Sequence, residues 1–218
     1  MTSATTQDRP ARAGAIGLLS IATGIAGFAL LAIHPGGEAK DFVDVLKNEA
    51  ANRTMDAIVH GGFVAVLALE AVCYAVLSAR LARVSATAGL VFFAFGAAFL
   101  SASKVLDGMV IPALATKYLA VPAKIEFAKS LFALVGTLIG LLMPIGLAFQ
   151  SAAIAVWGWA LVASGTARIA GIIGLAIGGA ASAALATTAG QMNPMVLMGA
   201  VAATSVWAVV AGIVLLRR

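Results

Sequence analysis

Charged residues are scarce in this sequence: they make up 11% of 218 residues, whereas about a quarter is usual in a soluble protein. Hydrophobic residues account for 62%. Cysteine is almost absent as well, because Cys73 stands alone, and this excludes an intrachain disulfide framework and a cysteine-based zinc site. The composition excludes an ordinary soluble domain, a disordered chain and a nucleic-acid partner. It predicts an integral membrane protein in contact with the lipid bilayer.

Common catalytic and channel motifs are missing too. The sequence contains no HExxH zinc motif, phosphate-binding loop, GxSxG nucleophile turn or dinucleotide-binding glycine pattern. It has neither an arginine-rich voltage-sensor pattern nor a selectivity-filter loop. The sequence therefore predicts the architecture more readily than the activity, and it leaves open whether the protein is an enzyme.

Apolar stretches long enough to cross a membrane occur six times. A spanning helix needs about 20 apolar residues, because the hydrocarbon core is about 30 Å thick. The predicted spans are 13–33, 57–78, 86–105, 129–159, 167–187 and 195–216. They predict an all-α membrane protein in which residues 1–218 form one bundle of six transmembrane helices. No small-x-small cleavage site follows the first span, so we expect that span to be retained.

Residues 122–164 contain no stretch of loop composition. As one helix they would be about 65 Å long, roughly twice the thickness of the hydrocarbon core. Two spans hinged at Pro144 and Gly146 would each be short and would reverse the orientation of everything downstream. We therefore predict one long helix that begins at Pro122 and projects from the membrane. Its Trp157 and Trp159 are expected at the far membrane interface.

The charge distribution predicts the orientation. With six spans, one side carries seven arginines and a single acid, whereas basic and acidic residues are equal in number on the other side. The arginines of the first side are Arg9, Arg12, Arg80, Arg83, Arg168, Arg217 and Arg218. Positive residues in short loops stay in the cytoplasm. We predict a multi-pass protein of the cell (inner or plasma) membrane whose N- and C-termini are cytoplasmic.

Residues 38–55, between the first two spans, are rich in charge. Phe42, Val43, Leu46 and Ala50 recur there at helical spacing. This pattern predicts a short amphipathic helix that lies on the outer membrane surface.

One acidic residue lies within a predicted span. Glu70 is about 20 Å from the outer side of the second span, at a depth where an ionisable residue is a candidate for function. We expect its carboxyl group to be protonated, with Lys104 too far away to pair with it. Polar residues expected near it are Ser20, Thr23, Gln150, Thr204 and Ser205. Glu70 is either a proton or cation site or a hydrogen-bonded structural acid.

A second polar group is expected at the outer ends of the first three spans. His34 ends the first span and His60 begins the second, so we expect them within one cofactor's reach of each other. Asp56, four residues before His60, is expected to orient that ring through its carboxylate. Lys104 and Asp107 are i,i+3 neighbours that can pair, and we expect them to line the same pocket.

Two kinds of cofactor are consistent with this pocket. Imidazole is a common ligand of haem iron, which makes His34 and His60 candidate haem ligands. Met192 and Met195 are also expected at the outer end, and thioethers together with imidazoles suit copper. The candidate metal ligands are therefore His34, His60, Asp56, Met192 and Met195. Methionines at helix ends are equally common as packing residues.

Three functions remain open at this point. The favoured one is a membrane-embedded metal- or haem-binding redox protein, or a subunit of one, with an outward-facing pocket. The second is a small ion- or proton-coupled transporter built around Glu70, and the third is a non-catalytic subunit or scaffold. A second copy or another membrane protein could dock through small-residue faces, although internal packing is their favoured role. These faces are Gly136 with Gly140 and Gly174 with Gly178.

Overall fold

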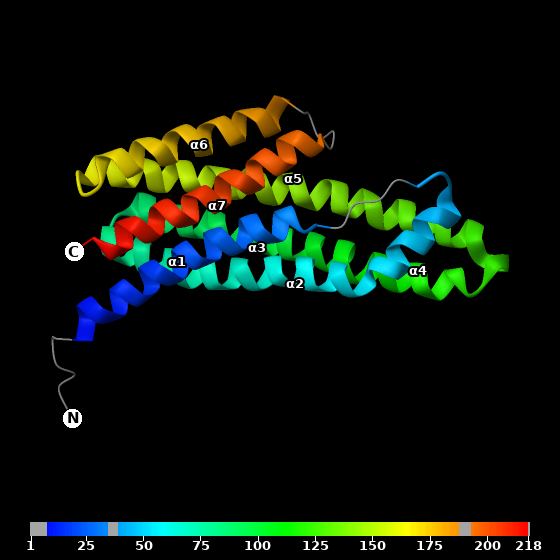
Figure 1. Ribbon diagram of the computed structural model, residues 1–218. Coiled ribbons are helices and arrows are strands. Elements are labelled where there is room, and N and C mark those ends of the chain that lie inside the picture. Colours follow the sequence, from blue (N-terminus) through cyan, green and yellow to red (C-terminus); the bar gives the residue numbers. More distant parts are fainter. Residues whose placement is uncertain (1–7, 35–38, 188–192, 218) are drawn as a thin grey trace.

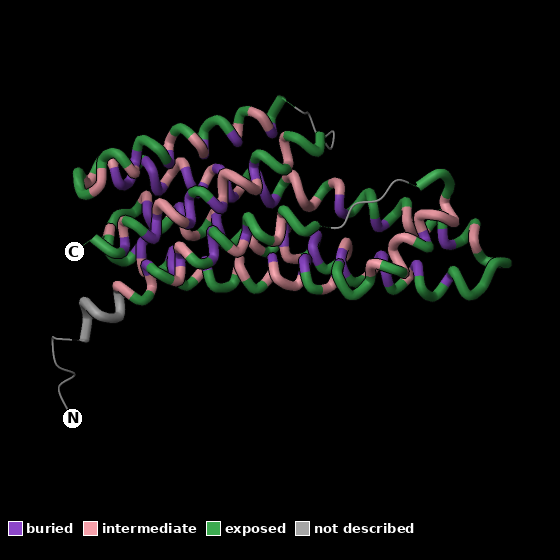
Figure 2. The backbone as a smooth tube through the Cα atoms, in the orientation of Figure 1, coloured by how far each residue is buried: buried purple, intermediate pink, exposed green. Residues whose placement is uncertain are grey.

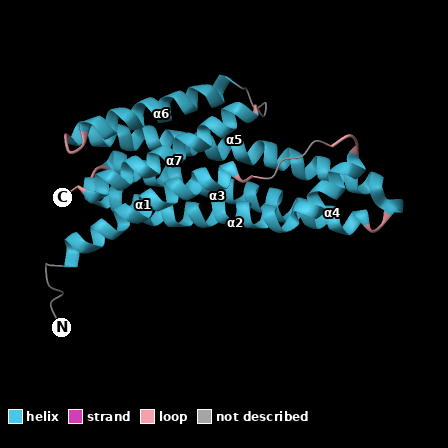
Figure 3. Ribbon diagram, in the orientation of Figure 1, coloured by secondary structure: helices cyan, strands magenta, loops and turns pink. Residues whose placement is uncertain are grey.

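The computed structural model describes residues 8–34, 39–187 and 193–217, with side chains omitted for residues 8–13. Throughout these residues the chain is helical or in connecting loops, with no strand (Figure 3). The elements in chain order are α1 (Asp8–Ala32), α2 (Phe42–Leu81), α3 (Val84–Val105), η1 (Leu106–Val110), α4 (Ile111–Leu119), η2 (Pro122–Lys124), α5 (Ile125–Ser164), α6 (Arg168–Thr187) and α7 (Pro194–Leu216). The predicted helical bundle is confirmed, and six helical segments are long and apolar enough to cross a membrane.

The helices have two different lengths. Both α2 and α5 contain 40 residues, which corresponds to about 60 Å of helix. The run of α3, η1 and α4 is also continuous, from Val84 to Leu119. These three rods extend past the ends of α1, α6 and α7 (Figure 1). We call the part of α2, η1, α4 and α5 that extends beyond the other helices the projecting end.

The long helix expected over residues 122–164 is present, because α5 continues through Pro144 to Ser164. The amphipathic segment after the first span is helical as well, and it is continuous with α2 instead of forming a separate helix. Its N-cap is Asp41, whose carboxylate accepts a hydrogen bond of 2.9 Å from the Asp44 backbone N–H. The segment therefore stands in the projecting end.

The projecting end has its own small apolar core. Ile111, Val135 and Ile139 are buried together, with side chains of η1, α4 and α5 packed around them. The first residue of α2 joins this part through an edge-to-face contact between Phe42 and Phe132, with ring centroids 5.2 Å apart. Burial of these apolar side chains stabilises the helix extensions outside the main bundle.

The main bundle is organised around Trp157, which is fully buried. Its indole Nε1–H donates to Ser78 Oγ (2.9 Å) and to the Ala86 carbonyl (3.0 Å), and its ring stacks on Trp207. The expected interfacial position of Trp157 is therefore wrong. Residues two apart on a helix point to nearly opposite faces, so only Trp159, which is 58% exposed, faces outward.

The outer faces of the bundle are apolar. Buried residues lie along the inside of the helices, and exposed ones lie along the outside (Figure 2). Many large hydrophobic side chains are exposed, including Leu18, Ile25, Val72, Phe95 and Ile169. An exposed apolar belt of this kind is unfavourable in water, and this supports contact with a lipid bilayer.

Small residues mainly serve packing inside the bundle. A methyl group on Gly174 would approach Trp207 to 2.6 Å, and one on Gly178 would approach the Ser151 carbonyl to 2.7 Å. These glycines let α6 pack closely against α5 and α7. Gly136 differs, because nothing lies within 4 Å of its position.

The opposite end of the bundle holds arginines. Arg80 Nη1 donates to the Leu215 carbonyl (2.7 Å), and Arg83 Nη2 donates to the Ala163 carbonyl (3.0 Å). Both acceptors belong to the last turn of a helix, where a positive charge is favourable. The arginine end and the projecting end are thus the two poles of the molecule.

Candidate metal centre

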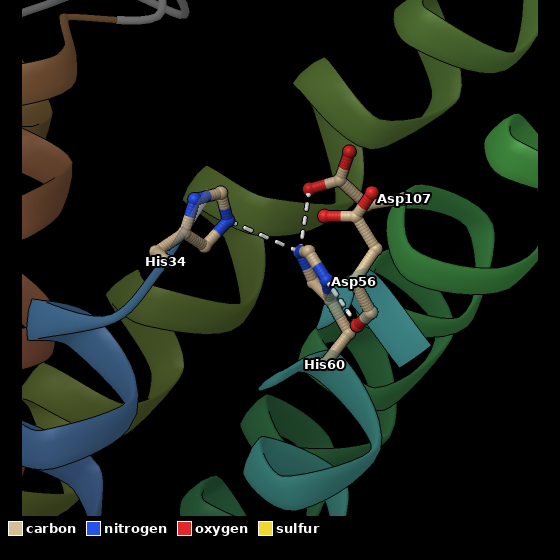
Figure 4. A network of polar contacts seen from close by, with 4 residues as sticks. All are labelled: His34, Asp56, His60 and Asp107. Carbon is tan, nitrogen blue, oxygen red and sulfur yellow. Dashed lines mark hydrogen bonds and ion pairs between the residues drawn. The ribbon is translucent and has the colours of Figure 1, made fainter. Parts of the chain in front are cut away.

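Three side chains from three elements converge beside the projecting end (Figure 4). His34 Nε2 lies 3.3 Å from His60 Nε2, and His60 Nε2 lies 3.0 Å from Asp107 Oδ2. One potential ligand atom of each residue lies within 4.8 Å of the other two. We call His34, His60 and Asp107 the three-ligand cluster.

The two histidines meet because α1 and α2 are antiparallel neighbours. His34 follows the last turn of α1, where the Ile33 N–H still bonds to the Ala29 carbonyl. His60 lies within α2 and is 2% exposed. Their ring centroids are 5.0 Å apart with an edge-to-face orientation. Two histidines expected within one cofactor's reach are therefore in direct contact.

Asp107 reaches the histidines because the helix widens at this point. Residues Leu106–Val110 form a turn of π-helix, which inserts an extra residue into the helical repeat. From its spacing Asp107 could pair with Lys104, and in the structure it bonds to His60. The next residue, Gly108, allows the close approach, since a methyl group there would lie 2.3 Å from His60 Cβ.

The backbone fixes which nitrogen of His60 faces the cluster. His60 Nδ1 is 2.9 Å from the main-chain carbonyl oxygen of Asp56. A carbonyl only accepts, so Nδ1 carries a proton and, in the neutral ring, Nε2 offers its lone pair to the cluster. The sequence predicted this orienting role for the Asp56 carboxylate. The main-chain oxygen fulfils it because His60 lies one turn after Asp56 on the same helix.

Two of the separations in the cluster are close to those of a tetrahedral metal site, and the third, between His34 and Asp107, is within 4.8 Å. In a tetrahedral site with bonds of about 2.0–2.1 Å, two ligand atoms lie about 3.4 Å apart. The distances of 3.3 Å and 3.0 Å are close to that value. Two lone pairs, on His60 Nε2 and Asp107 Oδ2, also repel each other unless a proton or another cation lies between them.

Negative charge surrounds the cluster. Asp56 is 7% exposed, and its charge interacts with His60, His34 and Asp107. Glu49, two turns earlier on α2, interacts electrostatically with Asp56, Asp107 and His60. Sequence reasoning placed Asp107 in the pocket of the histidines but not among the metal ligands, and it missed Glu49 as a neighbour. The glycine directly after Asp107 was the one available signal.

Lys104 and Glu70 lie apart from the three-ligand cluster, around a cavity of about 40 Å³ deeper in the bundle. Lys104 was expected in the outer pocket and too far from Glu70, yet both line this cavity. The Lys104 Nζ lies over the Phe63 ring, 5.2 Å from its centroid. The long side chain of Lys104 reaches into this cavity, and the spacing of residues along the sequence does not show where such a side chain extends.

The expected neighbours of Glu70 divide into two groups. Gln150, Thr204 and Ser205 line the same cavity. Ser20 donates to the Ala208 carbonyl (2.7 Å) and Thr23 to the Ser20 carbonyl (2.8 Å), so the hydroxyls of α1 are used elsewhere.

Of the two candidate methionine ligands, Met195 is the one in the described part of the chain, and it does not join the histidines. Met195 is the second residue of α7, is 77% exposed and lines a groove between α6 and α7 that contains no histidine. Met192 lies outside the described residues. The copper interpretation therefore gains no support from a thioether ligand.

Comparisons with known proteins give no family: no protein-family model, curated protein or solved structure matches this chain.

Proposed function

We propose that this membrane protein binds a divalent first-row transition-metal ion, with zinc as the reference ion, through His34 Nε2, His60 Nε2 and Asp107 Oδ2. The observation that supports this most directly is the convergence of three ligand atoms within 4.8 Å of one another, from the residues after α1, from α2 and from η1. Two of their separations are 3.3 Å and 3.0 Å. Two imidazoles and one carboxylate are ligands that such ions prefer.

Three protein ligands leave a fourth position for water or for an exchanging ligand. Asp107 is partly exposed and His34 is exposed, so this position is accessible. The carboxyl groups of Glu49 and Asp56 lie within electrostatic range of the cluster, and a cation bound there would favour their ionised forms. Ion capture beside the projecting end is therefore the function that the cluster supports best. With the arginine end in the cytoplasm, the site would face outward.

A bare ion fits this geometry better than a haem. An iron held between two axial imidazoles separates their nitrogens by about 4 Å, with the macrocycle lying between the rings. Here the two nitrogens are 3.3 Å apart and a carboxylate oxygen lies against one of them. Zinc is also preferred to copper as the proposed ion, because Met195, a candidate thioether ligand for copper, lies in another groove.

The test is to purify the protein in detergent without a nickel or zinc affinity step, and to measure bound metals and zinc affinity. We expect one zinc per chain. Removal of a ligand in His34→Ala, His60→Ala or Asp107→Asn should weaken binding by more than roughly 100-fold, beyond the typical effect of losing an outer-shell partner.

Asp44→Asn is the matched control, because Asp44 lies on α2 and pairs with Lys47 outside the cluster. Its zinc affinity should equal that of the unmodified protein. Undiminished zinc binding in a variant lacking all three ligands would contradict the proposal. A haem Soret band in the purified protein would contradict it as well.

A further inference from the structure

The cavity around Glu70 and Lys104 is unlike the apolar interior that surrounds it. Five helices line it, with Gly27 from α1, Glu70 from α2, Lys104 from α3, Gln150 from α5 and Ser205 from α7. Its volume is about 40 Å³, and about 10–15 Å³ is enough for one water molecule. Most of its wall is apolar, and the hydrogen-bonding groups that a buried water needs come from Glu70, Lys104, Gln150, Thr204 and Ser205.

The ionisable groups of this cavity have few protein partners: Lys104 lies over the Phe63 ring and interacts electrostatically with Asp107. Glu70 is 3% exposed and Lys104 is 9% exposed. In the described part of the chain, neither side chain forms a direct hydrogen bond or ion pair with another side chain or with the backbone. An isolated charge costs several kcal/mol or more at such a depth, so these two groups require each other or a bound species.

Gln150 gives an independent sign that something occupies the cavity. It is 2% exposed, and its Nε2 has no hydrogen-bond partner in the described residues. A buried amide N–H without an acceptor is rare in folded proteins. A water molecule in the cavity would accept this hydrogen and could bond to the Glu70 carboxyl as well.

We propose that Glu70 and Lys104 are linked by water in this cavity and hold one exchangeable proton between them. The proton resides either on the Lys104 amine, opposite a Glu70 carboxylate, or on the carboxyl, opposite a neutral amine. Transfer through water moves only this proton, breaking one N–H bond and forming one O–H bond. The pair is neutral in both states, which makes it tolerable inside the bundle.

The charged and titratable neighbours of the pair come from few elements. On α2, Cys73 and Tyr74 lie one turn beyond Glu70 and interact with it electrostatically. On η1, Asp107 interacts with Lys104 from the side of the three-ligand cluster. The walls from α5 and α7 add Gln150, Thr204 and Ser205, which are uncharged. The proton site thus lies next to the cluster, and neither Glu70 nor Lys104 is a ligand of the proposed metal.

The first test is a double-mutant cycle with Glu70→Gln and Lys104→Met, using the midpoint of thermal unfolding in lipid nanodiscs. Removal of one member leaves the other buried without its partner, whereas removal of both leaves no charge. We expect each single replacement to lower the midpoint more than the double replacement does. Glu126→Gln with Lys129→Met, an exposed pair on α5, is the control and should show additive effects.

The second test locates the proton by infrared spectroscopy. In Lys104→Met, Glu70 has to take up the proton, so this variant should show a carboxylic-acid C=O band. The double variant, Glu70→Gln with Lys104→Met, should lack that band. Additive effects in the cycle would overturn the proposal. So would the absence of that band in Lys104→Met. Both measurements use metal-free protein. A negative result in either of them would therefore contradict the proton-sharing proposal without contradicting the zinc-binding proposal.

Discussion

Gly108 lies so close to His60 that a methyl group at its position would be 2.3 Å from His60 Cβ and 2.6 Å from His60 Nδ1. The glycine follows Asp107 in the π-helical turn. One close contact thus brings the carboxylate of Asp107 to the imidazole and holds the imidazole against its carbonyl acceptor.

Gly108→Ala should displace His60 and disturb the cluster. We expect a lower unfolding temperature and a loss of zinc affinity of more than about tenfold, since 1.4 kcal/mol corresponds to a factor of ten. Gly136→Ala is the control: it meets nothing within 4 Å and should stabilise α5 by about 0.5–1 kcal/mol. Normal zinc affinity in Gly108→Ala would show that the close contact does not position the ligand.

Asp56→Asn should leave the orientation of His60 intact, because the main-chain carbonyl of residue 56 accepts the Nδ1 hydrogen. Only the nearby charge is lost, and we expect zinc affinity to fall by less than about tenfold. Asp107→Asn should have the much larger effect. The two variants, titrated side by side, distinguish a ligand from a neighbouring charge, and equal losses would contradict this assignment.

Trp157→Phe should destabilise the bundle by about 2–3 kcal/mol, since it removes the Nε1–H that bonds to Ser78 Oγ and the Ala86 carbonyl and also leaves a void. Trp159→Phe, at an exposed position, is the matched control and should change little. The unfolding midpoints of the two variants check this. Similar unfolding midpoints for the two variants would contradict a stabilising role for the hydrogen bonds and packing of Trp157.

The charge distribution predicts that the arginine end faces the cytoplasm. In a Cys73→Ser background, Lys47→Cys should react with a membrane-impermeant maleimide in intact cells. Arg217→Cys should react only after the cells are permeabilised. Labelling of Arg217→Cys from outside would reverse this orientation.

The sequence was sufficient for the spans and for the proximity of the two histidines, because hydrophobic length and helix adjacency follow from local pattern. It could not show that Asp107 turns to His60, since helical spacing assumes a regular repeat and η1 departs from it. It also misplaced Lys104, whose long side chain reaches into the Glu70 cavity. Side-chain reach and a widened turn depend on tertiary packing, and neither has a periodic signal.

The origin of the three ligands also links folding to metal supply. His34, His60 and Asp107 come from three separate elements, so an ion held by all of them binds the folded chain and not the unfolded one. By mass action, an ion at 100 times its dissociation constant would add about 2.7 kcal/mol to the free energy of unfolding. The heat resistance of this bundle would then rise and fall with the free zinc concentration around it. A cell that depleted the ion would shift the protein toward unfolding and degradation.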